Sequence, residues 1–165
     1  MAFSNQNPDS IKWPKDFAPS KTQVHVHNEL DIEAPRETIW AWLVKATLWP
    51  TWYSNSSNVK IEGGGTDLKA NSKFTWRTFG VNLSSRVQEY EPPERIAWSA
   101  SGTGVRAYHA FLIQKTPTGS HVITEENQKG AVARLSNAVR PNNMSRYHQL
   151  WLEALRSKAI QGAPQ

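Results

Sequence analysis

The chain has 165 residues, of which 38% are hydrophobic and 20% are charged, and its formal net charge is +5. This length suits one domain with one sizeable core, and the composition excludes a disordered chain. Because the chain contains no cysteine, disulfides, thiolate metal sites and a cysteine nucleophile are excluded. No apolar run is long enough to span a bilayer, and the N-terminus lacks the basic and apolar stretches of a secretion signal. We therefore expect a cytoplasmic protein without a membrane span.

The positive charge does not indicate a nucleic-acid partner. Lysines and arginines are scattered along the chain and form no basic run interleaved with aromatic residues. No nucleic-acid-binding motif is present. A solvated positive surface accounts for the charge, and we expect no nucleic-acid binding.

The first 22 residues differ in composition from the remainder. Pro8, Pro14 and Pro19 interrupt them, and few large apolar residues are present. This pattern predicts an extended N-terminal arm over residues 1–22, held to the body by Trp13. Residues 23–162 are expected to form a single domain.

The domain begins with a strand and two short helices. Residues 24–33 alternate strictly between apolar and polar positions, which predicts a strand with one buried face. Pro35 suits the first position of a helix, and an apolar stripe follows it over residues 36–46. Residues 47–53 contain Pro50 and are too short for more than one helical turn.

The middle of the chain predicts an antiparallel meander, because short alternating segments are separated by turn residues. The expected strands cover residues 58–62, 72–79, 81–89, 95–101, 105–115 and 121–128. From Gly130 the pattern becomes helical, and Pro141 divides it into a weak first part and a strong second part. The second part, about Met144 to Ile160, places its apolar residues on one helical face.

Several of these segments resemble one known group of proteins. They are Ile32-Glu33-Ala34-Pro35, the helix start Glu37-Thr38-Ile39-Trp40, Leu48-Trp49-Pro50-Thr51-Trp52, Tyr90-Glu91-Pro92-Pro93-Glu94-Arg95-Ile96, and Gly119-Ser120-His121-Val122-Ile123-Thr124. Together they resemble the SRPBCC superfamily, the START/Bet v 1-like group that includes polyketide cyclase/dehydrase-like proteins. The resemblance covers about residues 24–160. It implies an α+β helix-grip fold, in which a curved antiparallel sheet surrounds a long C-terminal helix, with two short helices after the first strand.

Common catalytic and metal-binding motifs are absent. There is no Gly-x-Ser-x-Gly elbow, and Gly63-Gly64-Gly65 lacks the lysine and helix of a phosphate-binding loop. His25 and His27 share one strand face, but the sequence places no third ligand near them. We interpret them as exposed polar positions and expect neither a metal nor a cofactor.

The best candidates for chemistry are His109 and Glu126 on the last two strands. If both face the cavity, they form a general acid and base for a condensation or dehydration. A pair that orients a ligand, or an ion pair that stabilises the sheet, is equally consistent with the sequence. Pairing about Thr118, within a turn over residues 116–120, would set His109 against residue 127 and would require a bulge to bring Glu126 inward. Without the bulge, Glu125 faces inward instead.

Further residues are candidates for contacts with a ligand. Asn28 interrupts an apolar strand face, and the others are large side chains expected to face the cavity. The candidate ligand-binding residues are Asn28, Trp76, Trp98, Phe111, Tyr147 and Trp151. Trp40 and Trp49 are expected to be structural. Tyr147 and His148 on the C-terminal helix can both reach the cavity, and core packing with a polar tip in water is the commoner role for such residues.

The sequence therefore predicts a protein that binds a small hydrophobic or aromatic molecule in an internal cavity. The alternative is a cofactor-independent cyclase, aromatase or dehydratase of the same fold that uses His109 and Glu126. A third interpretation, a protein-interaction domain of the cochaperone type, requires an exposed apolar patch. Both a monomer and a homodimer are compatible with the sequence.

Overall fold

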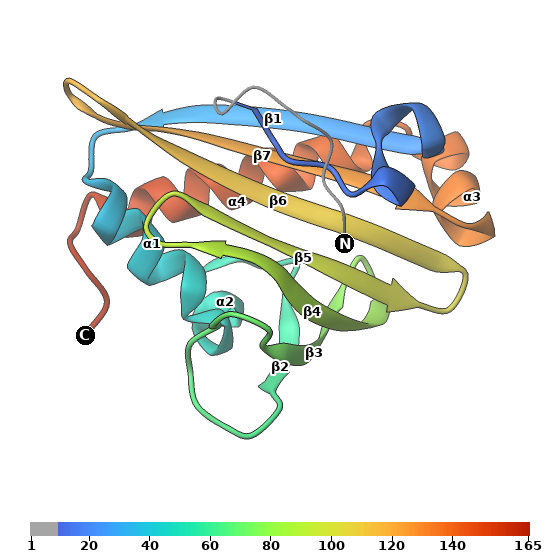
Figure 1. The fold of residues 1–165 in the computed structure, drawn as a ribbon, viewed down its shortest axis with the longest axis horizontal. Coiled ribbons are helices and arrows are strands. Elements are labelled where there is room, and N and C mark those ends of the chain that lie inside the picture. Colours follow the sequence, from blue (N-terminus) through green and yellow to red (C-terminus); the bar gives the residue numbers. More distant parts are fainter. Residues whose placement is uncertain (1–9) are drawn as a thin grey trace.

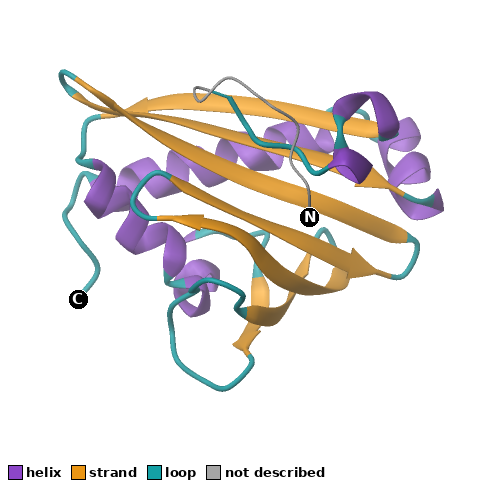
Figure 2. Cartoon of the chain, viewed as in Figure 1, coloured by secondary structure: helices purple, strands orange, loops and turns teal. Residues whose placement is uncertain are grey.

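The computed structural model describes residues 10–165 and shows one curved sheet with helices gathered on one face (Figures 1 and 2). Seven antiparallel strands follow the order β1-β7-β6-β5-β4-β3-β2. The long helix α4 runs along the concave face of this sheet, which is the helix-grip arrangement expected from the sequence. The strands are β1 Val24–Ile32, β2 Ser57–Ile61, β3 Lys73–Thr78, β4 Val81–Glu91, β5 Arg95–Gly102, β6 Val105–Thr116 and β7 Gly119–Lys129.

The helices precede and follow the central run of strands in the sequence, as predicted. The α-helices are α1 Arg36–Val44, α2 Trp49–Trp52, α3 Ala131–Val139 and α4 Asn143–Ala159, and the 3-10 turns are η1 Lys15–Phe17, η2 Pro19–Lys21 and η3 Ala46–Leu48. Pro35 precedes α1 as its N-cap rather than being its first residue. The helix ends at Val44 instead of Ala46 because Lys45 leaves the helical conformation, with a ψ of 66°.

Trp49 lies at the centre of the core under the sheet. Its side chain is fully buried, and its ring centroid lies 5.3 Å from Trp76, 5.5 Å from Trp98 and 5.2 Å from Trp151. The indole N–H donates a 2.9 Å hydrogen bond to the carbonyl of Leu43 in α1. A buried indole normally requires such a partner. Trp49 therefore joins α1 and α2 to both the sheet and α4.

The described part of the N-terminal arm covers the opposite face of the sheet. Ile11, Trp13 and Phe17 are buried there against Tyr108 and Leu112. The carbonyl of Phe17 accepts a 2.7 Å hydrogen bond from the side-chain amide of Asn127. Residues 15–21 form η1 and η2, so the expectation of a fully extended arm is wrong for this stretch. Residues 1–9 of the predicted arm lie outside the described residues.

The turn between β6 and β7 is shorter than predicted, and the expected register about Thr118 is wrong. Thr116 pairs with Gly119, so only Pro117 and Thr118 form the turn, and the ladder continues without a bulge. Gly119 joins the strand because it passes close to β1: a Cβ atom at Gly119 would lie 2.3 Å from the carbonyl oxygen of Ile32. This register sets His109 directly opposite Glu126.

We expect Trp49→Ala to lower the free energy of unfolding by about 3–5 kcal/mol, because it removes a large buried side chain from a close-packed core. Equilibrium urea denaturation measures this change. The matched control is Trp42→Ala, which truncates a partly exposed indole at the edge of the same core. A loss at Trp49 no larger than the loss at Trp42 would contradict the central role of Trp49.

Candidate functional site

A cavity of about 400 Å³ lies between the sheet, α3 and α4. Most of its wall is apolar or aromatic, with contributions from Trp76, Trp98 and Trp151. Three buried ionisable side chains also reach the cavity, namely His109 from β6, Glu126 from β7 and His148 from α4. An apolar cavity with a few convergent polar groups is typical of a small-molecule site.

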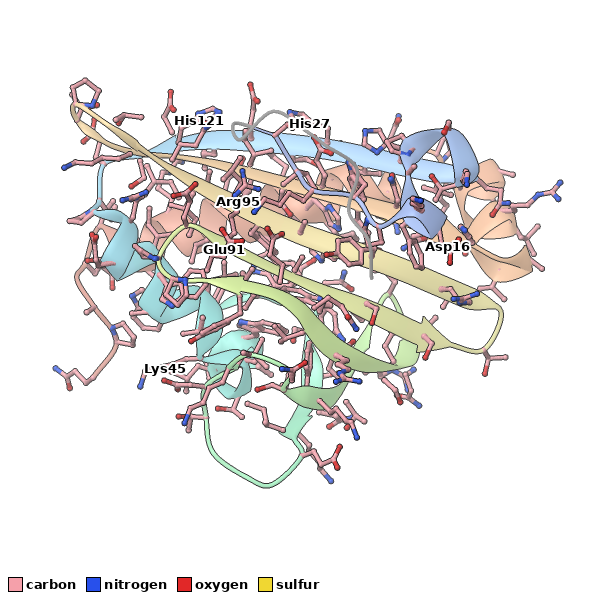
Figure 3. All side chains as sticks on the ribbon, in the orientation of Figure 1. Asp16, His27, Lys45, Glu91, Arg95 and His121 are labelled. Atoms are coloured by element: carbon pink, nitrogen blue, oxygen red, sulfur yellow. The ribbon has the colours of Figure 1, made fainter. Side chains whose placement is uncertain are left out.

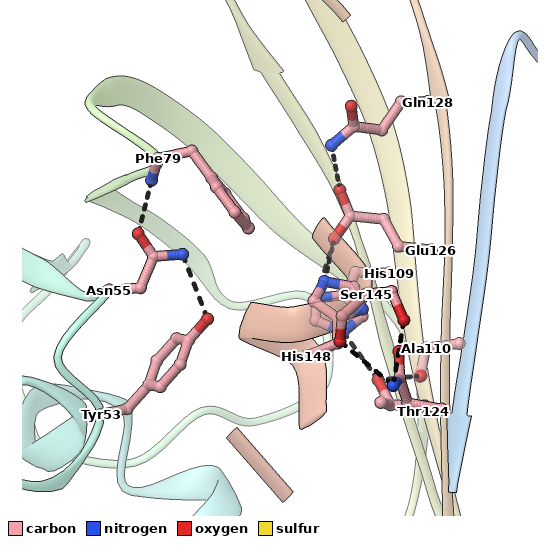
Figure 4. Close-up of polar contacts among 11 residues, drawn as sticks. Tyr53, Asn55, Phe79, His109, Ala110, Thr124, Glu126, Gln128, Ser145 and His148 are labelled. Atoms are coloured by element: carbon pink, nitrogen blue, oxygen red, sulfur yellow. Dashed lines mark hydrogen bonds and ion pairs between the residues drawn. The ribbon is translucent and has the colours of Figure 1, made fainter. Parts of the chain in front are cut away.

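Glu126 is the centre of the polar cluster (Figure 4). Its Oε2 atom accepts a 3.1 Å hydrogen bond from Nε2 of His148 and lies 3.4 Å from Nδ1 of His109. Its Oε1 atom accepts a 2.6 Å hydrogen bond from the side-chain amide of Gln128. The carboxylate is therefore hydrogen-bonded from β7 and α4 at once, as a buried charge requires.

The hydrogen bonds around His109 determine which ring nitrogen carries its proton. The hydroxyl of Thr124 donates to the carbonyl of Ala110 at 3.2 Å and lies 2.8 Å from Nε2 of His109. Because a hydroxyl has only one proton to donate, Thr124 accepts the Nε2–H of His109. In the neutral ring, Nδ1 then carries a lone pair on the side of Glu126.

The two imidazoles of the cluster are stacked. The rings of His109 and His148 are parallel within 2°, and their centroids are 4.7 Å apart. Trp98 and Trp151 meet His109 edge-on at centroid distances of 5.0 and 5.2 Å. Nδ1 of His148 is buried without a hydrogen-bond partner among the described residues.

Burial shifts the pKa of a histidine and the pKa of a carboxyl group in opposite directions. Desolvation lowers the pKa of His109 to about 3, and the attraction of Glu126 offsets only part of that effect. Desolvation alone would raise the pKa of Glu126, but the hydrogen bonds from His148 and Gln128 and the nearby imidazoles lower it overall. At neutral pH the site therefore contains a neutral His109 beside an ionised carboxylate.

The same three residues are the best metal-ligating group within residues 10–165. One ligand atom from each of His109, Glu126 and His148 lies within 4.8 Å of the other two. Zinc and related ions prefer imidazole nitrogens in the ring plane and carboxylate oxygens. Because the two rings are parallel and stacked, one ion can lie in the plane of only one of them unless a ring rotates. We assign no metal here, and the expectation of no cofactor stays a prediction.

The predicted ligand contacts fall into two groups. Trp76, Trp98 and Trp151 line the cavity together with His109 and Glu126. Phe111 does not line it, because its ring packs behind His109 at a centroid distance of 4.8 Å.

Asn28 and Tyr147 contact protein rather than the cavity. The amide nitrogen of Asn28 donates to the carbonyl of Ser145 and to the side chain of Gln149, both at 3.1 Å, and so ties β1 to α4. Tyr147 packs edge-on against Phe79 at a centroid distance of 5.4 Å. Neither residue is among those that line the cavity.

The structure also separates the two candidate carboxylates. Glu125 points to the opposite face of the sheet, where its Oε1 atom lies 2.7 Å from Nδ1 of His27. His27 and His121 lie along the β1 edge of the sheet, away from the cavity cluster (Figure 3). Glu126, not Glu125, therefore faces the cavity.

Sequence reasoning missed the part played by His148. The signal was present, because His148 follows Met144 by four residues and precedes Trp151 by three, and therefore shares their buried helical face. The sequence did not indicate at which residues along β7 the helix α4 packs. Only that placement brings His148 within hydrogen-bond distance of Glu126.

A search against protein families matched residues 23–159 to the family described as polyketide cyclase / dehydrase and lipid transport. The chain belongs to this family. The match spans the whole sheet, α3 and all of α4, so it includes every residue of the cavity cluster. A comparison with curated protein sequences found no match.

Solved structures agree with this family assignment. A hypothetical protein, jhp0584 from Helicobacter pylori, is 30% identical, with a TM-score of 0.85 over 96% of this chain and 99% of that one. A START superfamily protein from Mycobacterium smegmatis is 14% identical, with a TM-score of 0.68 over 83% of this chain and 97% of that one. One half of the di-domain aromatase/cyclase StfQ of the steffimycin pathway is 13% identical, with a TM-score of 0.68 over 84% of this chain and 51% of that one. The last two show the fold alone.

Acid should destabilise this family member through His109. The folded protein keeps His109 neutral to about pH 3, whereas the unfolded chain takes up the proton near pH 6.5. Between these values the unfolded state binds more protons, so the free energy of unfolding falls by about 1.4 kcal/mol per pH unit. Urea denaturation of the wild-type protein and of His109→Gln measures this effect. Between pH 7 and pH 5 the free energy of unfolding should fall by about 2 kcal/mol more in the wild-type protein than in the variant.

His25→Gln is the control, because it removes an exposed histidine from the β1 edge. It should keep the pH dependence of the wild-type protein. A His109→Gln variant with an unchanged pH dependence would show that His109 is not held neutral by the fold.

Proposed function

We propose that this protein binds a small apolar or aromatic molecule in the cavity between the sheet and α4. The observation that carries the proposal is the cavity itself, about 400 Å³ in volume and walled by three tryptophans. Removing apolar ligand surface from water into such a cavity is favourable, by about 25 cal/mol per Å². Indole faces and edges also suit the stacking and edge-on contacts of an aromatic ring.

The polar cluster supports a narrower ligand class. Nδ1 of His109 and the carboxylate of Glu126 are both hydrogen-bond acceptors at the cavity wall, and they lie 3.4 Å apart. Two neighbouring acceptors are best satisfied by a donor placed between them. We therefore infer that the ligand carries a hydroxyl or N–H group on its apolar body, directed at these two atoms.

The cavity proposal predicts binding of 1-naphthol, measured by isothermal titration calorimetry. Ala107 is buried in the cavity wall, so Ala107→Leu fills part of the space and should weaken binding at least tenfold. Ala70→Leu adds the same bulk at an exposed loop position and should leave binding unchanged. Equal affinity for the two variants would place the ligand elsewhere.

The donor proposal is tested with two matched probes, of which the second carries a methyl group in place of the hydroxyl hydrogen. 1-Naphthol should bind about ten- to a hundredfold more tightly than 1-methoxynaphthalene, since hydrogen bonds to charged groups contribute about 1.5–3 kcal/mol. Glu126→Gln should reduce this preference while the methoxy compound keeps its affinity. Equal affinities in the wild-type protein would contradict the donor proposal but leave the cavity proposal intact.

A cyclase- or dehydratase-type enzyme is the second candidate, and the position of His109 beside Glu126 favours it. Nδ1 of His109 carries a lone pair at the cavity wall that can take a proton from the carbon beside a ligand carbonyl, and the carboxylate of Glu126, 3.4 Å away, would stabilise the imidazolium that forms. The enolate carbon then forms a bond to a second carbonyl within the same molecule, and protonation followed by loss of water completes the ring. Such intramolecular chemistry requires no cofactor.

Glu126→Gln distinguishes the two functions when a linear β-polyketone is used as the probe. An enzyme should lose turnover by about 10²- to 10⁴-fold, the usual contribution of a positioned acid or base. If the protein only binds its ligand, neither the wild-type protein nor Glu126→Gln should close the ring faster than buffer alone. Mass spectrometry of the loss of water measures the reaction. Glu125→Gln is the matched control, because it neutralises the neighbouring carboxylate on the opposite face of the sheet and keeps Glu126.

A further inference from the structure

Helix α3 presents apolar side chains to solvent at the rim of the cavity. Val132, Leu135 and Val139 are 37%, 66% and 68% exposed, although α3 also lines the cavity. Only Ala133 in this helix is buried. Leucine and valine exposed together on one short helix form a contiguous apolar surface, which in soluble proteins usually marks an interaction site.

The opposite rim of the cavity is also apolar. The hairpin between β3 and β4 supplies Phe79, Val81 and Leu83, all of them half-buried residues of the cavity wall. Thr78 pairs with Val81, so Phe79 and Gly80 form a two-residue turn, and both have positive φ values as this type of hairpin requires. The N–H of Phe79 donates a 2.9 Å hydrogen bond to the side chain of Asn55, which holds the hairpin tip in place (Figure 4).

The described segments that form this rim carry positive charge only. Residues 73–88, 95–124 and 127–152, which include both hairpins at the rim, α3 and the first half of α4, contain no aspartate or glutamate. The N–H of Val132 donates to the carbonyl of Gly104, so the β5–β6 turn lies against α3. The exposed arginines in or next to α3 and α4 in these segments are Arg134, Arg140 and Arg146, whereas Arg77, Arg86 and Arg106 project from the opposite face of the sheet.

We propose that this rim docks onto a membrane surface that contains anionic lipids. Leu135, Val139 and the tip of the β3–β4 hairpin would enter the boundary between headgroups and acyl chains, and the arginines would contact lipid phosphates. The cavity then opens toward the bilayer, so an apolar molecule passes between lipid and protein without crossing water. The proposal goes beyond ligand binding in the cavity and does not depend on it.

The charge distribution favours a lipid surface over a second copy of the chain. Two copies that met through this rim would bring arginines of like charge together, which opposes association. An anionic bilayer instead complements both the apolar strip and its positive surroundings. A helix that combines leucine and valine with arginine is also typical of segments that lie in the interface plane of a membrane.

Vesicle flotation tests the proposal directly. The wild-type protein should float with vesicles of phosphatidylcholine and 30% phosphatidylglycerol at 0.15 M NaCl, and much less with pure phosphatidylcholine. The double variant Leu135→Glu/Val139→Glu should lose binding at least tenfold. Arg134→Gln and Arg140→Gln should each weaken it about fivefold.

Ile160→Glu is the matched control, because Ile160 is 59% exposed at the far end of α4 and does not line the cavity. It should float like the wild-type protein. The chain has no cysteine, so Val139→Cys and Ile160→Cys each accept one polarity-sensitive dye. Only the dye at position 139 should shift to the blue when vesicles are added.

Three results would overturn the proposal. They are an absence of flotation with anionic vesicles, flotation that is unaffected by Leu135→Glu/Val139→Glu, and a dimer in light scattering that the same double variant dissociates. The last result would assign the rim to self-association, and specific capture of an acidic protein without flotation would assign it to a protein partner. Arg134 does not line the cavity, so Arg134→Gln should weaken flotation and retain 1-naphthol binding. Failure at the membrane is therefore distinguishable from failure of the cavity proposal.

Discussion

The burial of one carboxylate constrains how the sheet and α4 fit together. An ionised group inside an apolar core is tolerated only when it is paired and its oxygens are hydrogen-bonded. Both oxygens of Glu126 accept hydrogen bonds, one from His148 on α4 and the other from Gln128 on β7. Any shift of α4 along the sheet would break the contact with His148 and leave a buried charge with one partner fewer. The position of α4, and with it the cavity wall, therefore depends on this cluster.

The two faces of the sheet are buried by different parts of the chain. On the concave face, α4 and the tryptophans around Trp49 cover the strands. On the convex face, Trp13 and Phe17 cover Tyr108 and its neighbours. Strand β6 is consequently buried on both sides over most of its length. Residues 10–22 of the N-terminal arm lie on the face opposite the cavity, where they bury part of the sheet and take no part in the candidate site.

The cavity and its rim have complementary properties. The inner wall is closely packed, because its aromatic rings contact one another and His148 is hydrogen-bonded to Glu126. The rim at α3 is exposed and held largely through Ala133 and the contact with Gly104. Segments with few buried apolar contacts open at low free-energy cost. Entry of a ligand at α3 therefore requires little disturbance of the core, and membrane docking would place this entrance where apolar molecules are most concentrated.

The sequence by itself determined the order of the elements and most of their faces. Strict alternation in residues 24–32 identified the buried face of β1, and the helical spacing from Met144 to Trp151 identified the buried face of α4. The aromatic wall of Trp76, Trp98 and Trp151 followed from the same patterns. Tertiary structure decided the register of β6 against β7, because the close approach of β1 to Gly119 makes this glycine a strand residue and shortens the turn. It also decided that Glu126 and not Glu125 faces the cavity, since β6 is apolar on both faces and its pattern does not distinguish them. The contact of His148 with Glu126 depends on where two elements cross, and local spacing carries no information about that crossing.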